Sequence, residues 1–294
     1  MKSLVIGLGI GNLYKSILEG MGGVVVTVDT DVNKNADYRT LDEALRGHNH
    51  FDTVHVCTPN RTHLLLADIA AAHAKVVFIE KPGFQHSEEL EFINQKYPST
   101  RFMMVKNNMW RTNVNDIRDH VRSADVIKIN WINRDRVPNP GSWFTTKQFA
   151  WGGVSRDLMP HMLSWFIALN VNYQQAKLVS WSSEQRHSLN TIEDTAYGTV
   201  NKKGHYNVDD WCKMVFEQNN KQWILEADWR SLGEEDIGIT FVKPDTTVKI
   251  PLGLCPEEAY SNMIVDAYEN IYNSHYWNKQ LEQDVYIMDM VNKL

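Results

Sequence analysis

The sequence has little of what metal centres, disulfide scaffolds and membrane spans need. It holds three cysteines in 294 residues, Cys57, Cys212 and Cys255, with no CxxC motif or Cys/His cluster. This usage argues against structural zinc and disulfides and fits a reducing compartment. No apolar run approaches the ~20 residues of a transmembrane helix, and the apolar start is interrupted by Lys2 and two glycines, unlike a signal peptide. We therefore expect a cytoplasmic protein with no metal and no membrane contact.

Positive charge is also scarce. The formal net charge is -6 at pH 7, and Lys and Arg form no block. Nucleic-acid binding depends on neutralising phosphates with clustered basic side chains, so a nucleic-acid partner is excluded and a small-molecule ligand is expected. The sequence shows no internal repeat or low-complexity tract, and its length suggests two domains. All ten tryptophans lie between Trp110 and Trp277, which places the domain boundary near residues 110 to 122.

The first part of the chain alternates between two hydrophobic periods. Short apolar runs, typical of buried parallel strands, alternate with segments of helical periodicity. The pattern predicts a doubly wound α/β fold with a parallel sheet. The predicted strands are 4–6, 24–28, 53–56, 76–79 and 101–105, and the predicted helices are 13–20, 38–46, 63–73 and 87–96.

The first strand leads into a helix through a glycine-rich turn. Gly7, Gly9, Ile10 and Gly11 form this turn. Glycines there let the backbone approach a pyrophosphate, whose charge is favoured at the helix N-terminus. The third glycine of the usual GxGxxG pattern is replaced by Asn12, so we expect the packing of helix on strand to accommodate a larger side chain.

An acidic residue follows the second strand, where a dinucleotide-binding unit places the carboxylate that takes the ribose hydroxyls. This residue is Asp29, and the neighbouring Thr30 and Asp31 supply no arginine for a 2'-phosphate. The pattern favours NAD as the cofactor over NADP. A plain turn residue is the alternative interpretation of Asp29.

Polar residues also follow the third and fourth strands. Thr58, Pro59 and Asn60 end one strand and are followed by His63, while Glu80 and Lys81 end the next, before Pro82. Ligands of open α/β sheets bind at the carboxyl ends of strands, which makes Lys81 a catalytic candidate. A lysine that only pairs with Glu80 is the alternative, and His63 is as well explained as a helix cap or packing residue.

The second part of the chain consists mainly of short aromatic and β-branched runs separated by turn residues. They predict a mainly antiparallel sheet. The predicted strands are 126–133, 177–183, 196–201, 208–217, 222–229, 237–242 and 246–250, and a helical tail follows from 256 to 294.

One helix interrupts these strands after Gly152 and Gly153. Because proline fits only the first turn of a helix, Pro160 predicts a start between Asp157 and Met159. Asp157 and His161 are four residues apart, which puts them on one helix face if the helix has begun. The alternatives are an N-cap role for Asp157 and a core position for His161.

These motifs together resemble the glucose-fructose oxidoreductase / inositol dehydrogenase / MocA family. The resemblance rests on the glycine turn, Asp29, Thr58-Pro59-Asn60 with His63, Glu80-Lys81-Pro82, and Gly152-Gly153 followed by Asp157 and His161. It implies an N-terminal Rossmann domain (1–120), and then a substrate and oligomerisation domain (121–294) with a large open sheet and C-terminal helices.

The resemblance also implies roles for these residues. Thr58, Pro59 and Asn60 would lie along the nicotinamide side of NAD, and Lys81 would reach both nicotinamide ribose and substrate. His161 would be the general base or acid, with Asp157 beside it. His63 and Glu80 match the cofactor-binding motifs, and the Lys81–Pro82 peptide is expected to be cis.

Further residues are expected around the substrate. Arg134, Arg156 and Trp143 are candidate pocket walls, with a solvated loop as the alternative. After the fifth strand, Arg111 or one of the asparagines Asn107 and Asn108 would face the nicotinamide, with a polar crossover loop as the alternative. The implied function is NAD-dependent oxidation of a secondary alcohol in a sugar, cyclitol or related polyol. Redox-assisted glycoside cleavage and non-catalytic NAD sensing are the alternatives. The resemblance further implies a homodimer or homotetramer through the open sheet, with the aromatic residues of 206–229 at the interface.

Overall fold

The computed structural model describes residues 1–194 and 197–294 and divides the chain into two compact units. Unit 1 comprises Met1–Trp110 and Pro256–Asp289, and unit 2 comprises Arg111–Cys255 and Met290–Leu294. The C-terminal helices, which we expected in the second domain, therefore pack almost entirely within unit 1. None of the helices in the described ranges has both the length and the apolar composition of a membrane span.

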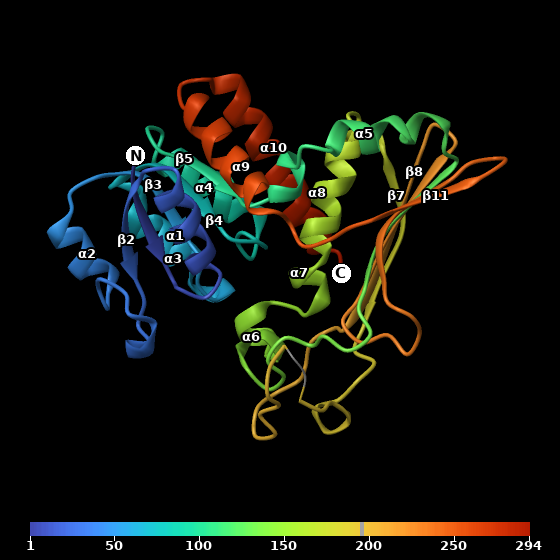
Figure 1. The fold of residues 1–294 in the computed structure, drawn as a ribbon, viewed down its shortest axis with the longest axis horizontal. Coiled ribbons are helices and arrows are strands. Elements are labelled where there is room, and N and C mark those ends of the chain that lie inside the picture. Colours follow the sequence, from blue (N-terminus) through green and yellow to red (C-terminus); the bar gives the residue numbers. More distant parts are fainter. Residues whose placement is uncertain (195–196) are drawn as a thin grey trace. The chain divides into compact units, whose positions relative to one another are not determined.

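Unit 1 is built on a sheet of five parallel strands in the order β2-β1-β3-β4-β5 (Figure 1). This confirms the predicted doubly wound parallel sheet. Val76, Val77, Phe78 and Ile79 of β4 are almost completely buried, as the continuous apolar run predicted. The strands are β1 (Lys2–Ile6), β2 (Val24–Val28), β3 (Phe51–Val56), β4 (Ala74–Ile79) and β5 (Arg101–Met104).

The crossover helices of unit 1 are α1 (Gly11–Gly20), α2 (Leu41–Gly47), α3 (His63–Ala71) and α4 (Ser87–Lys96). Helix α2 begins three residues later than predicted. Thr40 caps it by accepting a hydrogen bond from the Glu43 amide, and Tyr38 instead pairs with Val28 at the end of β2. This pairing brings the segment after β2 back to the edge of the sheet.

The two C-terminal helices of unit 1 are α9 (Glu257–Glu269) and α10 (Ser274–Val291). An ion pair with both side chains fully buried joins α10 to the end of β5: Lys106 Nζ lies 2.6 Å from Asp284 Oδ1. The other Asp284 oxygen accepts a hydrogen bond from the Met104 amide at 2.8 Å. Burial lowers the pKa of Lys106 and raises the pKa of Asp284. The Asp284 charge opposes the shift of Lys106, and the Lys106 charge opposes the shift of Asp284. The tail therefore completes the core of unit 1.

Unit 2 is built on a six-stranded sheet in the order β11-β10-β6-β9-β8-β7. Strands β6 and β9 are parallel and the other neighbours are antiparallel, which confirms the predicted mainly antiparallel sheet. The strands are β6 (Val126–Ile132), β7 (Lys177–Glu184), β8 (Trp211–Gln218), β9 (Lys221–Asp228), β10 (Asp236–Val242) and β11 (Thr247–Pro251).

One predicted strand of unit 2 is wrong. We expected a strand over 196–201; residue 196 lies outside the described residues, and 197–201 form a turn and one isolated bridge. The described residues between β7 and β8 are instead held by backbone and side-chain hydrogen bonds, such as those of the Asn201 amide to the Pro140 carbonyl oxygen and of the Val200 amide to Asp194 Oδ1. They include the short helical turn Leu189–Thr191.

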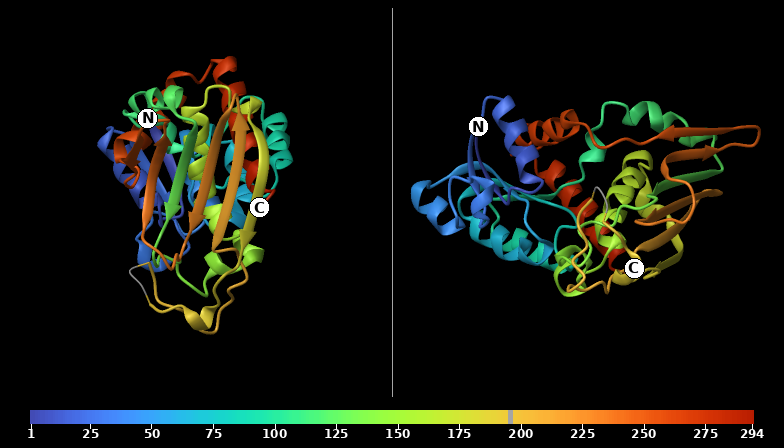
Figure 2. Two further views of the ribbon diagram at one scale, coloured as in Figure 1. Left: turned by 90° about the vertical axis from the view of Figure 1, so that its right-hand side faces the viewer. Right: turned by 60° about the horizontal axis from the view of Figure 1, so that its bottom comes forward.

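The helices of unit 2 are α5 (Val114–Asp119), α6 (Lys147–Ala150), α7 (Val154–Asp157) and α8 (Met159–Leu169). Helix α8 packs against β6 and β9 on one face of the sheet. No described helix of unit 2 covers the opposite face, as the left view of Figure 2 shows. Trp211 of β8 lies on this opposite face and is half-buried.

The Lys106–Asp284 pair gives a test of how α10 is held. Lys106→Met leaves a carboxylate buried without its cation, and we expect it to destabilise the protein by about 3–5 kcal/mol. Asp284→Leu should do the same. The double variant Lys106→Met/Asp284→Leu buries no charge and should recover at least half of the combined loss. Urea unfolding followed by tryptophan fluorescence measures this. Strict additivity of the two single losses would contradict the coupling.

Candidate active site

The three glycines of the turn after β1, Gly7, Gly9 and Gly11, have three different surroundings. Gly7 has φ +91°, and a Cβ there would lie 2.6 Å from the Cys57 carbonyl oxygen, so the turn requires glycine. A Cβ on Gly11 would lie 2.8 Å from Cγ1 of Val5, so Gly11 permits the close packing of α1 on β1. A Cβ on Gly9 would meet nothing within 4 Å. Gly9 therefore leaves open the space that a dinucleotide pyrophosphate would need.

The expectation for Asn12 was wrong. Its side chain is exposed and its Nδ2 donates to the Leu8 carbonyl at 2.8 Å, so it takes no part in packing α1 on β1. The third-glycine role falls to Gly11, one position earlier. Ile10, the residue before α1, is 43% exposed.

Asp29 supports the same turn from the end of β2. Its Oδ2 accepts a hydrogen bond from the Leu8 amide at 2.6 Å and its Oδ1 accepts one from the Asp31 amide at 2.8 Å. The carboxylate is partly exposed and is followed by the exposed Thr30. A negative charge here suits ribose hydroxyls and disfavours a 2'-phosphate, so the residues present fit NAD.

An arginine that no sequence pattern indicated, Arg39, lies beside the turn after β2. The Arg39 guanidinium donates to the carbonyl oxygens of Asp29 at 3.4 Å and Asp31 at 3.0 Å. It reaches them because Tyr38 pairs with β2. Since its N–H groups bind main-chain carbonyls, Arg39 stabilises the turn after β2.

The segment after β3 is held by side chains of its own turn and by His63. Thr62 Oγ1 lies 2.7 Å from Thr58 Oγ1 and from the Pro59 carbonyl oxygen. Asn60 is buried, whereas Thr58 and Pro59 are half-buried. The turn is therefore held by hydrogen bonds among its own residues.

His63 is completely buried and bridges two strand ends. Its Nδ1 lies 2.7 Å from the Gly83 carbonyl oxygen and its Nε2 lies 2.8 Å from the Thr58 carbonyl oxygen. Burial lowers the pKa of His63, while the two carbonyls oppose that shift. The position favours a packing residue that ties the loop after β3 to the loop after β4.

Glu80 and Lys81 differ in their surroundings. Glu80 is buried, and its Oε1 accepts a hydrogen bond from the Tyr14 hydroxyl at 2.7 Å. Burial, followed by the Glu80 charge, raises the pKa of Tyr14, which keeps this hydroxyl a donor. Lys81 is half-buried at the carboxyl end of β4, and the Lys81–Pro82 peptide is cis, as predicted.

His161 occupies a special position in unit 2. Every residue of α8 is buried except His161, which is half-buried in the first turn. Its ring centroid lies 6.1 Å from that of Trp131 on β6. Helix α8 begins at Met159, with Pro160 in its first turn, within the predicted range.

Asp157 does not share a helix with His161. It is the last residue of α7, and the chain starts a new helix after Leu158, whose carbonyl oxygen accepts from the His161 amide at 3.0 Å. Nor is Asp157 the N-cap of α8. Its Oδ2 accepts a hydrogen bond from Nε1 of Trp229, which is almost fully buried, at 3.0 Å. Sequence analysis missed Trp229, which lies 72 residues away.

The four predicted substrate residues lie in different environments of unit 2. Arg111 donates to the Gly253 carbonyl oxygen at 2.8 Å and lies over the Trp165 ring at 5.6 Å. Arg134 is exposed, and Trp143 stacks on Phe144 at 3.9 Å between centroids. Arg156 donates to Asn292 Oδ1 at 2.6 Å. Burial lowers the pKa of Arg156 to about 10, so it stays a cation at neutral pH.

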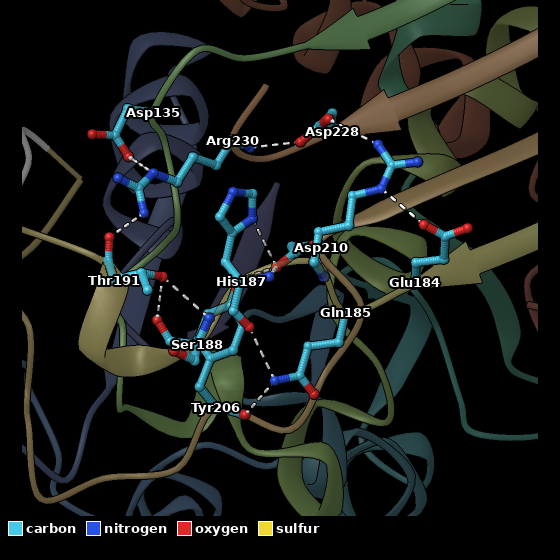
Figure 3. Close-up of polar contacts among 11 residues, drawn as sticks. Asp135, Glu184, Gln185, His187, Ser188, Thr191, Tyr206, Asp210, Asp228 and Arg230 are labelled. Carbon is cyan, nitrogen blue, oxygen red and sulfur yellow. Dashed lines mark hydrogen bonds and ion pairs between the residues drawn. The ribbon is translucent and has the colours of Figure 1, made fainter. Parts of the chain in front are cut away.

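A second polar cluster surrounds Asp210, just before β8 (Figure 3). This fully buried carboxylate accepts hydrogen bonds from the amides of Arg186 and His187 at 2.7 and 2.9 Å and from the Tyr206 hydroxyl at 3.0 Å. His187 Nδ1 lies 3.2 Å from it. Asp210 thereby anchors the segment between β7 and β8, and sequence analysis gave it no role.

The different surroundings of Gly9 and Gly11 generate a matched pair of variants. Gly9→Ala places a methyl group in the open space, so we expect unchanged thermal stability and at least a tenfold loss of NADH affinity. Gly11→Ala forces the methyl group against Val5, so we expect a lower unfolding temperature. Differential scanning fluorimetry and NADH fluorescence titration measure the two effects. Equal NADH affinity of Gly9→Ala and the unsubstituted protein would contradict the assignment of the turn.

Residues 25–101 match the model of the oxidoreductase family with an NAD-binding Rossmann fold, GFO_IDH_MocA. A curated protein of Amycolatopsis mediterranei (strain S699), named as an oxidoreductase subunit of UDP-kanosamine synthase, is 29% identical over 116 residues. That match covers 38% of this chain and 32% of the relative, so it spans about a third of the relative's length.

Solved structures match over nearly the whole chain. GenD2 from gentamicin A biosynthesis, in complex with NAD, has a TM-score of 0.76 at 17% identity and covers 99% of this chain and 92% of its own. Levoglucosan dehydrogenase with NADH and levoglucosan has a TM-score of 0.73 at 17% identity, covering 100% and 96%. A myo-inositol dehydrogenase of Corynebacterium glutamicum has a TM-score of 0.72 at 12% identity, covering 99% and 94%.

At these identities the structural likeness shows a shared fold. The family match covers the strands and turns that hold Asp29, Thr58 and Lys81. Residues 25–101 thus match the family that the sequence motifs resemble, and the solved structures show that the whole chain shares the fold.

Proposed function

We propose that this protein is an NAD-dependent oxidoreductase that transfers a hydride between a secondary alcohol of a sugar, cyclitol or related polyol and nicotinamide. The observation that carries the proposal is His161, the one residue of α8 that is not buried, four positions after Asp157, which Trp229 holds by a hydrogen bond. A buried helix that leaves a single imidazole accessible is suited to moving a proton. The relatives named for levoglucosan and myo-inositol support the substrate class.

In the proposed mechanism His161 accepts the hydroxyl proton of the substrate. General base catalysis of this kind contributes roughly 10²–10⁴ in rate. Asp157, with one oxygen fixed by the Trp229 indole, orients the imidazole and stabilises its protonated form. Nicotinamide, when bound, accepts or returns the hydride.

Lys81 is assigned to the same reaction by its motif. An ammonium group near a developing alkoxide stabilises its negative charge and lowers the pKa of the substrate hydroxyl. The position of Lys81 is set by buried neighbours: Glu80 is fixed by Tyr14, and Gly83 by His63. Thr58, Pro59 and Asn60 are proposed to line the nicotinamide side of the cofactor, and Arg111, Arg134, Trp143 and Arg156 remain candidates for substrate contact.

The test is a screen of sugars, inositols and glycosides with NAD and NADP separately, read by absorbance of the reduced nicotinamide. On the best substrate, His161→Ala should lower kcat by 10²–10⁴ and change NADH affinity less than twofold. His205→Ala is the control, because His205 is an exposed histidine of the same unit. Full activity of His161→Ala would remove the assignment.

Other outcomes of the screen separate the alternatives. Release of the aglycone from a glycoside without net NADH supports redox-assisted glycoside cleavage. Binding of NAD without turnover on any substrate, and indifference of that binding to Lys81→Ala and His161→Ala, supports a sensor. Turnover with NADP in preference to NAD contradicts the role given to Asp29.

We also propose that the protein acts as a cytoplasmic homodimer or homotetramer. All three cysteines are free thiols, which suits a reducing compartment. The uncovered face of the six-stranded sheet, on which the half-buried Trp211 lies, is the proposed interface. Cell fractionation tests the location, and a monomer mass by light scattering at working concentration would end the proposal of an oligomer.

A further inference from the structure

Asp209 makes an unusual set of contacts with the turn before α7. Its Oδ1 accepts hydrogen bonds from the Gly153 amide and the Ser155 hydroxyl, both at 2.9 Å, and its Oδ2 accepts one from the Ser155 amide at 2.7 Å. Its main-chain carbonyl accepts a fourth, from the Val154 amide, at 2.9 Å. One residue thus binds three consecutive amides and a hydroxyl of a segment 54 to 56 positions away.

The glycine pair makes this close approach possible. A Cβ on Gly153 would lie 1.8 Å from the Asp209 carbonyl oxygen, and a Cβ on Gly152 would lie 2.9 Å from Ser155 Oγ and 3.3 Å from Asp209 Oδ1. Neither glycine has a positive φ. The pair is therefore required by contact with Asp209 and Ser155, and the turn and Asp209 fit each other.

The turn held by Asp209 leads directly to the proposed catalytic pair. Helix α7 has four residues and ends at Asp157, and His161 follows in the first turn of α8. So short a helix has little stability of its own. Its position depends on the contacts at its two ends. Asp209 binds the turn at its N-terminal end, and the Trp229 indole donates to Asp157 at its C-terminal end.

The two supports come from the same place in the sheet. Asp209 and Asp210 precede β8, and the Asp210 carbonyl oxygen accepts from the Trp229 amide at 2.9 Å. The side chain of Asp210 points to the segment of Arg186, His187 and Tyr206 (Figure 3), whereas that of Asp209 binds the turn. Adjacent carboxylates thus fix two different segments of unit 2.

We propose that Asp209 is a positioning residue for Asp157 and His161, acting through the Gly153–Ser155 turn. This inference rests on the proposed function, because it assigns the purpose of the contact to proton transfer at His161. Asp209 has no direct part in the chemistry: its two carboxylate oxygens accept from the turn that they position. A displacement of about 1 Å in a reacting group is enough to cost roughly 10² in rate.

Asp209→Asn is the informative variant. The amide has nearly the same size but keeps only one acceptor oxygen, so an NH₂ group must face one of the three donors of the turn. We expect kcat on the best polyol to fall 10- to 100-fold, with the KM for that polyol and the NADH affinity changed less than threefold. The indole N–H resonance of Trp229, assigned with Trp229→Phe, should shift because its Asp157 partner moves.

Asp52→Asn is the matched control. Asp52 is also a half-buried carboxylate that accepts from a backbone amide, that of Lys2 at 2.8 Å, and from Lys75, but it lies at the amino ends of β1 and β3 in unit 1. Asp52→Asn should lower stability and leave kcat within twofold.

Ser155→Ala is the substitute variant if Asp209→Asn does not fold. It removes only the hydrogen bond from the Ser155 hydroxyl to Asp209. We expect it to lower kcat two- to fivefold and to shift the Trp229 indole N–H resonance.

The outcomes separate the positioning role from a merely structural one. A kcat within twofold and an unmoved Trp229 resonance in Asp209→Asn, or in Ser155→Ala if only that variant folds, would overturn the inference. So would an equal loss of kcat in Asp52→Asn. If no polyol reduces NAD with the unsubstituted protein, the proposed function fails by itself. The Trp229 resonance still decides whether Asp209 positions Asp157.

Discussion

The parallel register of the five-stranded sheet is the constraint on which unit 1 depends. Parallel strands bring all their carboxyl ends to one edge, so Gly7, Asp29, Thr58 and Lys81 meet there although the sequence separates them widely. The side chains that secure this edge are buried: Tyr14 binds Glu80, and His63 joins the loops after β3 and β4. The groups left accessible are those suited to a dinucleotide.

The sheet of unit 2 is mainly antiparallel, so its strands do not bring their carboxyl ends to one edge. The position of His161 depends on α8 and on the turn before α7. The carboxylate of Asp209 and the indole of Trp229 hold that turn and its end. In a sequence, a glycine pair suggests a flexible segment. Here Gly152 and Gly153 instead allow Asp209 to come close enough to bind the turn by several hydrogen bonds.

Local patterns predicted the elements and the motifs, because strand runs, turns and Pro160 act over a few residues. The contacts that position the site could not be predicted in the same way. Asp209 lies 56 residues from Gly153, and Trp229 lies 72 from Asp157, and neither spacing carries a periodic signal. The packing role predicted for position 12 was wrong for a similar reason, because the geometry of the turn decides whether position 11 or 12 faces Val5. Residues 197–201 of the expected strand 196–201 instead bond to Asn139, Pro140 and Asp194, which hydropathy does not report.

The ion pair between Lys106 and Asp284 has a consequence for co-translational folding. The two residues are 178 positions apart, so at 5–20 residues per second the ammonium group waits roughly 9–36 s for its carboxylate. During that interval all five strands of the Rossmann sheet have been made, but the end of β5 still lacks the carboxylate that pairs with Lys106. That edge of the sheet reaches its final packing only after α10 has been synthesised.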